Sequence, residues 1–75
     1  PDPRLYHAAL EHLGVSVHQA AFVGHRTIEL EGARAVGLRT IAFNYDPDAL
    51  ADTYITSFAD LLKLVDETIP LPDVR

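Results

Sequence analysis

Two short apolar runs, separated by a stretch of helical periodicity, constrain the fold of this chain more than any other feature. Residues 20–23 are apolar throughout, and residues 40–43 are apolar and β-branched, which is typical of strands. Between them, residues 27–36 carry apolar side chains at helical spacing. Two strands joined by a helix need a crossover connection, and such crossovers produce parallel sheets. The first run therefore predicts a strand buried on both faces. The inward face of the helix is expected to hold Ile28, Ala33 and Val36.

A further helix is predicted at the beginning of the chain. Asp2 is suited to the N-cap, and Pro3 to the first helical position. Gly14 follows as a left-handed C-terminal residue, after which Val15 is placed to fold back on Leu10. The apolar stripe of this helix consists of Leu5, Tyr6, Ala9, Leu10 and Leu13. Residues 15–19 are expected to form a loop.

The second half of the chain is predicted to end the sheet and add a last helix. Residues 44–48 contain turn formers, and residues 48–53 are expected to form a short helical turn. Tyr54 and Ile55 are candidates for a third, minimal strand. Ser57 would then cap a helix, with Asp60 as its capping-box partner. The apolar face of that helix consists of Phe58, Leu61, Leu62 and Val65. We therefore expect an α/β domain over residues 1–68, with two to three short parallel strands flanked by three helices, and a loose tail over residues 69–75.

Composition excludes several classes of function. Six basic residues against eleven acidic ones give a net charge of −5, which disfavours binding to nucleic acid. No apolar run approaches the roughly 20 residues that span a bilayer, so no membrane association is expected. The absence of Cys excludes disulfides and Cys-based zinc sites. The absence of Met suggests a cut or processed start. Because so small a parallel sheet lacks partners for its strands, we expect the chain to belong to a larger fold or to associate with a second copy.

Polar residues gather where the first predicted strand meets the following helix. Gly24, His25 and Glu29 lie at this junction, and in open α/β sheets ligands bind outside the carboxyl ends of the strands. A helix N-terminus there offers free N–H groups. The alternative is purely structural, because the helix dipole alone favours Glu29 and because His25 is an ordinary turn residue. On spacing alone the structural interpretation is favoured.

The remaining polar residues give weaker signals. His7, His12 and His18 show no metal-binding spacing and are expected on the solvated surface. The three aspartates of residues 46–52 lack the glycine and distal glutamate of a calcium loop, so a solvated acidic loop is predicted. No Gly-rich nucleotide-binding signature occurs.

Several motifs, taken in order, resemble the C-terminal part of the core domain of haloacid-dehalogenase-like (HAD-like) hydrolases. The resemblance runs from residue 1 to about residue 65. It is carried by residues 1–6, 8–10, 13–15, 21–24, 31–38 and 57–62. It implies a partial Rossmann-like core and magnesium-dependent phosphoryl transfer through an aspartyl-phosphate. Many members of the family are phosphatases of small phosphate esters such as phosphoglycolate. A cytoplasmic location is expected for this protein.

The resemblance transfers few functional residues to this chain. The family's Asp-x-Asp nucleophile motif and its Ser/Thr motif have no counterpart, and its lysine would stand one position before Pro1. The fourth motif is Gly-Asp followed after three residues by Asp. Gly24 matches it, whereas His25 and Glu29 replace the two aspartates. The resemblance therefore implies Glu29 and His25 as metal ligands, Glu29 directly or through water, and no catalytic nucleophile within the chain. The alternative for His25 is to contact a phosphate oxygen or to orient a neighbouring carboxylate. Arg26 would contact a phosphate or face solvent. Imidazole nitrogen suits zinc, copper, iron or nickel better than Mg²⁺.

Three functional hypotheses follow. In the first, the chain is a fragment of a HAD-like phosphatase, inactive by itself, whose parent uses Mg²⁺ and a small phosphorylated substrate. Its partner would be the rest of its own core domain, or a second copy across the strand edges. In the second, the parent is catalytically silent and serves binding or assembly. In the third, the chain is a free-standing α/β module that dimerises through its strand edges.

Overall fold

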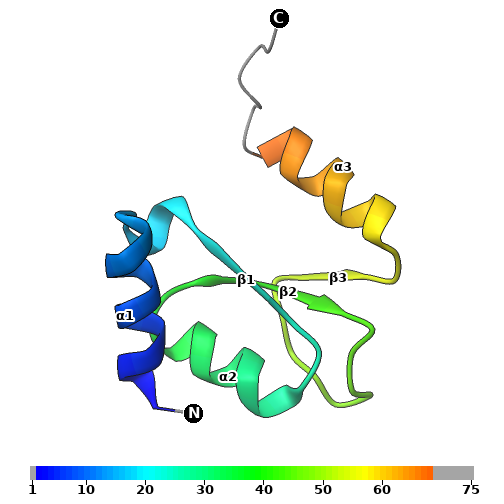
Figure 1. Cartoon of the computed structure of the whole chain (residues 1–75). Coiled ribbons are helices and arrows are strands. Elements are labelled where there is room, and N and C mark those ends of the chain that lie inside the picture. The colour runs from blue at the N-terminus through cyan, green and yellow to red at the C-terminus, as the bar shows by residue number, and fades with distance from the viewer. Residues whose placement is uncertain (1, 69–75) are drawn as a thin grey trace, which may run out of the picture.

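The computed structural model describes residues 2–68 and has an α/β architecture, as predicted (Figure 1). Its three strands form one parallel sheet in the order β1-β2-β3, compatible with a partial Rossmann-like core. The predicted third strand is thus confirmed. In chain order the elements are α1 (Pro3–Leu13), the short 3-10 helix η1 (Val17–Gln19), β1 (Ala21–Gly24), α2 (Thr27–Ala35), β2 (Arg39–Phe43), β3 (Thr53–Ile55) and α3 (Phe58–Thr68).

The helices cover the sheet unequally. Helix α2 packs on β1 and β2, and α1 packs against α2. Helix α3 contacts β3 and lies on the other side of the sheet from α2 (Figure 1). The main core cluster joins α1 to α2 and to the start of β2, and it consists of Tyr6, Leu10, Ala33 and Leu38.

Both ends of α1 follow the prediction. The side chain of Asp2 accepts a hydrogen bond of 2.9 Å from the backbone N–H of Arg4, so it caps the helix. Gly14 has φ 71°, the left-handed conformation that ends a helix. The N–H of Val15 donates to the carbonyl of Leu10 over 3.1 Å. The loop predicted for residues 15–19 differs in one respect, because η1 forms a short 3-10 helix within it.

The buried face of α2 differs from the prediction. Leu30 and Ala33 are fully buried against the sheet, whereas Ile28 is 55% exposed. The prediction for Ile28 is therefore wrong. Ile28 lies two residues before Leu30, which places it about 200° around the helix. Apolar residues thus occupy opposite faces of α2, and the sheet covers only one of them.

The prediction that the first strand is buried on both faces is wrong. Within residues 2–68, strand β1 lies at an edge of the sheet and pairs with β2 alone. Phe22 points into the core beside α1 and α2, but Val23 is 42% exposed. Strand β2 is the central strand, and its residues 40–42 are buried. Burial on both faces thus occurs in the strand that has neighbours on both sides.

The helical turn predicted for residues 48–53 is also wrong. These residues are irregular up to Asp52, and β3 begins at Thr53. The hydroxyl of Tyr54 accepts from the N–H of Ala51 over 3.1 Å and donates to the carbonyl of Ala49 over 3.2 Å. A side chain thus satisfies backbone groups that a helical turn would otherwise pair.

Helix α3 begins as predicted but is only partly covered. The hydroxyl of Ser57 accepts a hydrogen bond of 3.1 Å from the backbone N–H of Asp60. Phe58 and Leu62 are 63% and 56% exposed, so much of the predicted apolar face meets solvent. The predicted tail lies outside the described residues. None of the helices in residues 2–68 is long and apolar enough to cross a membrane.

Candidate functional site

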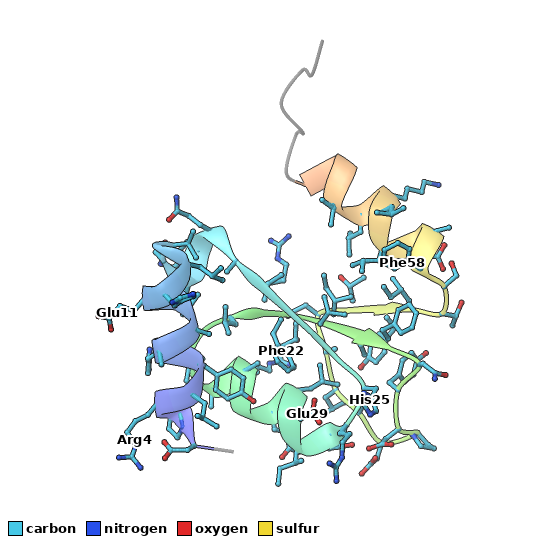
Figure 2. The ribbon with its side chains drawn as sticks, in the orientation of Figure 1. Arg4, Glu11, Phe22, His25, Glu29 and Phe58 are labelled. Carbon is cyan, nitrogen blue, oxygen red and sulfur yellow. The ribbon has the colours of Figure 1, made fainter. Side chains whose placement is uncertain are left out.

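The candidate site is the turn between β1 and α2. Figure 2 shows His25 at the carboxyl end of β1 and Glu29 in the first turn of α2. Gly24 ends the strand without a positive φ, so it is not required for a sharp turn. A Cβ at this position would lie 2.5 Å from the ring atom Cε2 of Phe22. Any other residue at this position would therefore force the Phe22 ring to shift.

The N-terminus of α2 is capped from a distant loop. Arg26 occupies the N-cap position, but its side chain makes no capping hydrogen bond. Instead, a carboxylate oxygen of Asp46 accepts from the backbone N–H of Thr27 over 3.2 Å. The Thr27 hydroxyl donates to Asp48 over 2.8 Å, and the N–H of Asp46 donates to the carbonyl of His25 over 2.9 Å. The loop after β2 thus closes onto the candidate site.

The three aspartates of residues 46–52 are exposed, as predicted for a solvated acidic loop, but their carboxylates also accept hydrogen bonds. Asp46 and Asp48 are exposed, yet each accepts a hydrogen bond from Thr27. Asp52 is also exposed, and its carboxylate accepts from both the N–H and the hydroxyl of Thr40. Negative charge is favoured near a helix N-terminus, so Asp46 occupies a position that an anionic ligand would otherwise prefer.

Glu29 lies between a cation and an apolar groove. Its carboxylate is 4.0 Å from Nε of Arg26, and its main-chain carbonyl accepts a 2.8 Å hydrogen bond from the hydroxyl of Tyr6. Glu29 also lines a groove of about 420 Å³ between α1 and β1, whose walls include Tyr6 and Phe22. Burial raises the pKa of Tyr6 above its ordinary value, and the charge of Glu29 raises it further.

The described residues do not assemble a magnesium site. Among the side chains of residues 2–65, no group of three or more His, Asp or Glu is placed to hold a metal ion. Glu29 offers one carboxylate and His25 one imidazole, whereas Mg²⁺ prefers oxygen ligands in octahedral geometry. The roles of Glu29, His25 and Arg26 therefore stay predictions. The other histidines, His7, His12 and His18, are exposed.

Sequence reasoning located this turn but missed the loop that closes it. Asp46 and Asp48 lie in a run of turn formers, which predicts a loop but not the residues that the loop contacts. Their partner Thr27 lies 19 and 21 residues away, so only the parallel pairing of β1 and β2 brings them together.

Comparison with known proteins connects the chain to a phosphatase. It is 27% identical to the phospholysine phosphohistidine inorganic pyrophosphate phosphatases of Rattus norvegicus and Homo sapiens. Each match covers 87% of this chain and 28% of the relative, so the chain spans less than a third of the relatives' length. No family model matches the chain, and no solved structure matches it. The similarity supports a distant relationship to HAD-like phosphatases.

Proposed function

We propose that this chain is one segment of a cytoplasmic, metal-dependent phosphatase of the HAD-like type. One observation carries the proposal. The chain is similar to a phosphatase over 87% of its length, and it has a polar turn at the carboxyl end of parallel strand β1, with Glu29 in the first turn of the helix that follows. In α/β sheets this is the end at which ligands bind.

In this proposal the chemistry is divided between this segment and another. Within residues 2–68, strand β1 is paired on one side only. A strand added at its free edge would place a nucleophilic aspartate beside the turn. The aspartate oxygen would attack phosphorus, the leaving group would depart, and water would then hydrolyse the acyl phosphate. Glu29 would contribute a carboxylate and Arg26 a phosphate contact. Magnesium would need further oxygen ligands from the added segment.

The proposed substrates are small phosphate esters of the phosphoglycolate type. The relatives are named for phospholysine, phosphohistidine and inorganic pyrophosphate, which carry P–N or P–O–P bonds. These compounds share a transferable terminal phosphoryl group with the esters. A panel that includes both kinds of compound therefore identifies the substrate class.

The test uses the longest natural protein that contains this chain. Phosphate release from phosphoglycolate, pyrophosphate and phosphohistidine is measured with and without Mg²⁺. Glu29→Gln is expected to lower metal-dependent activity by about tenfold or more, as loss of a metal-supporting carboxylate does. Glu31→Gln is the matched control, because Glu31 is an exposed glutamate of the same helix. An equal loss in both variants would contradict the assignment of Glu29. Hydrolysis by the 75-residue chain alone would contradict the division of the chemistry.

A second candidate function is self-association through the edge of β1. The exposure of Val23 on an unpaired strand edge favours it. Sedimentation of the chain over a concentration series tests it, with Val23→Lys expected to abolish a concentration-dependent dimer. A monomer at every concentration contradicts this candidate. If the longer protein is inert towards every phosphate compound and still assembles, a catalytically silent binding module is the better description.

A further inference from the structure

A second cavity lies at the opposite end of the strands from the candidate site. It has a volume of about 570 Å³ and opens where β1 and β2 begin. Ala21, the first residue of β1, lies in its wall and pairs in register with Arg39, the first residue of β2. The candidate site lies beyond Gly24, the last residue of β1. The two sites are therefore separated by the whole length of the strand.

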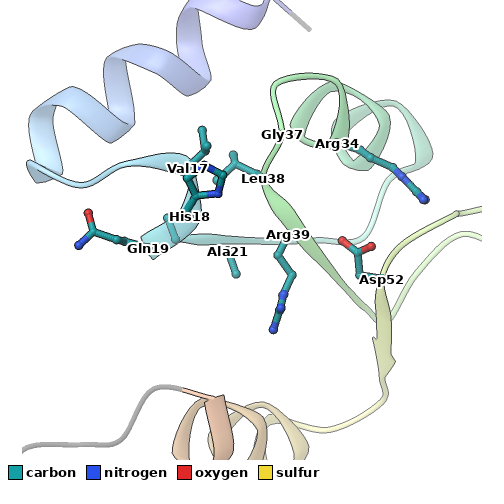
Figure 3. A pocket seen from close by; sticks show the side chains of 10 residues that line it. Val17, His18, Gln19, Ala21, Arg34, Gly37, Leu38, Arg39 and Asp52 are labelled. Carbon is teal, nitrogen blue, oxygen red and sulfur yellow. The ribbon is translucent and has the colours of Figure 1, made fainter.

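Arginine side chains dominate the charge of this cavity. Arg34 comes from the last turn of α2 and Arg39 from the start of β2. Both are exposed, and neither guanidinium group makes a hydrogen bond or an ion pair with the side chains of residues 2–65. Figure 3 shows Asp52 between the two arginines, with Arg39 extending towards α3. Both charges act on Asp52, but the N–H groups of the two guanidinium groups are available to an incoming anion.

The one carboxylate in the cavity is already bound by the protein. An oxygen of Asp52 accepts from the N–H of Thr40 over 2.8 Å and from its hydroxyl over 3.1 Å. The N–H of Asp52 donates back to the Thr40 hydroxyl over 3.0 Å, and Thr40 is fully buried. This reciprocal contact holds the start of β3 to β2. Its single negative charge leaves the two arginines with one positive charge in excess, in a chain whose net charge is −5.

We infer that this cavity binds a small molecule carrying a phosphate group. Guanidinium groups pair with phosphate oxygens through parallel charge-assisted hydrogen bonds, and the excess positive charge of the cavity favours an anion that can accept several such bonds. The volume lies within the roughly 300–1,000 Å³ that is usual for small-molecule sites. His18 lines the same wall and supplies a further hydrogen-bonding group, whereas the side-chain oxygen of Gln19 accepts from the N–H of Ser16 over 3.0 Å.

The experiment uses inorganic phosphate and pyrophosphate as probes of the ¹⁵N-labelled chain, with ionic strength held constant by chloride. Both probes are expected to shift the backbone resonances of residues 18–21, 34–39 and 52. Arg34→Gln and Arg39→Gln are each expected to weaken binding by about tenfold or more, because hydrogen bonds to charged groups are the stronger kind. Lys63→Gln is the charge-matched control, since Lys63 is an exposed cation of α3 outside the cavity.

Each result decides the proposal. Saturable shifts at the cavity that either arginine substitution abolishes, while Lys63→Gln changes the affinity by less than about twofold, support it. Shifts confined to residues 25–29 assign the phosphate to the candidate site and overturn the inference. Equal weakening by all three substitutions indicates a non-specific charge effect and also overturns it. Because the arginines are exposed, circular dichroism of the variants is expected to match that of the parent chain.

Discussion

The hydroxyl of Tyr6 on α1 donates a 2.8 Å hydrogen bond to the main-chain carbonyl of Glu29 on α2. The Tyr6 ring also lies edge-on to Phe22 of β1, with ring centroids 5.5 Å apart. One side chain thus joins the first helix to the strand and to the helix that frame the candidate site. The position of Glu29 therefore depends on α1, although α1 contributes none of the proposed ligands.

Tyr6→Phe should lower the free energy of unfolding by about 1 kcal/mol, because it removes this hydrogen bond and keeps the ring packing. Urea unfolding followed by circular dichroism measures the change. Tyr45→Phe is the matched control, since the Tyr45 ring packs edge-on to Tyr54 but its hydroxyl makes no hydrogen bond to residues 2–68. The control should stay within about 0.5 kcal/mol of the parent. Equal losses would show that the bond to Glu29 is not the cause.

Thr27→Val should loosen the candidate site. The substitution keeps the shape of the side chain but removes the hydroxyl that donates to Asp48. The expected loss is about 1 kcal/mol of stability, with faster hydrogen exchange in the first turn of α2. Thr53→Val in β3 is the control, because the Thr53 hydroxyl bonds to none of residues 2–68. Unchanged exchange at α2 in Thr27→Val would mean that the loop holds its place without this bond.

The lowered pKa of Asp52 predicts that the fold loses stability in acid. Hydrogen bonds from Thr40 and, to a lesser extent, the charges of Arg34 and Arg39 hold the pKa of Asp52 below its ordinary value of 3.8, and partial desolvation opposes them. A group whose pKa is lowered by folding stabilises the fold above its unfolded pKa, and the effect disappears as the pH falls through the folded pKa. Asp52→Asn should therefore be less stable than the parent near neutral pH.

The stability difference between the parent and Asp52→Asn should shrink once the pH falls below about 4. Urea unfolding at a series of pH values measures it. The lowered pKa of Asp2, which is bound to Arg4, adds an acid loss of its own, but it is common to both proteins and cancels. A difference that stays constant down to strongly acidic pH would assign the role of Asp52 to shape and not to charge.

Gly24→Ala should destabilise the end of β1. The new methyl group would lie 2.5 Å from the Phe22 ring, which packs against both core clusters and cannot move away freely. Overpacking of this kind costs about 1–3 kcal/mol. The double variant Gly24→Ala/Phe22→Leu tests the cause, because a smaller side chain should relieve the clash. If the cost of Gly24→Ala is the same in both backgrounds, the Phe22 ring is not responsible.

The sequence predicted the features that depend on neighbouring residues. Asp2 and Pro3 begin α1, Gly14 ends it, and Ser57 caps α3, because each signal acts within a few residues of the chain. The polar turn after β1 was found for the same reason. The buried face of α2 was not predicted correctly. Ile28 and Leu30 are both apolar, and the local pattern does not show which of their two faces the sheet covers.

Features that depend on the number of strands or on distant pairing were missed. The exposure of Val23 depends on which helix covers its face of the sheet, because α2 packs on the Phe22 side of β1 and the helix on the other side, α3, packs against β3. No local pattern encodes this arrangement. The contacts of Thr27 with Asp46 and Asp48 arise only once β2 lies beside β1. The candidate site was thus located by sequence, but its closure is a property of the assembled sheet.

The loop that closes onto Thr27 also implies an order in which parts of the fold form. During synthesis the first turn of α2 leaves the ribosome before the residues that cap it, which follow 19 and 21 positions later. Until the chain has extended through β2, the N–H of Thr27 has only water to bind. The start of α2 is therefore expected to be among the last parts of the fold to become fixed. The polar turn would acquire its final shape only after the sheet beneath it exists.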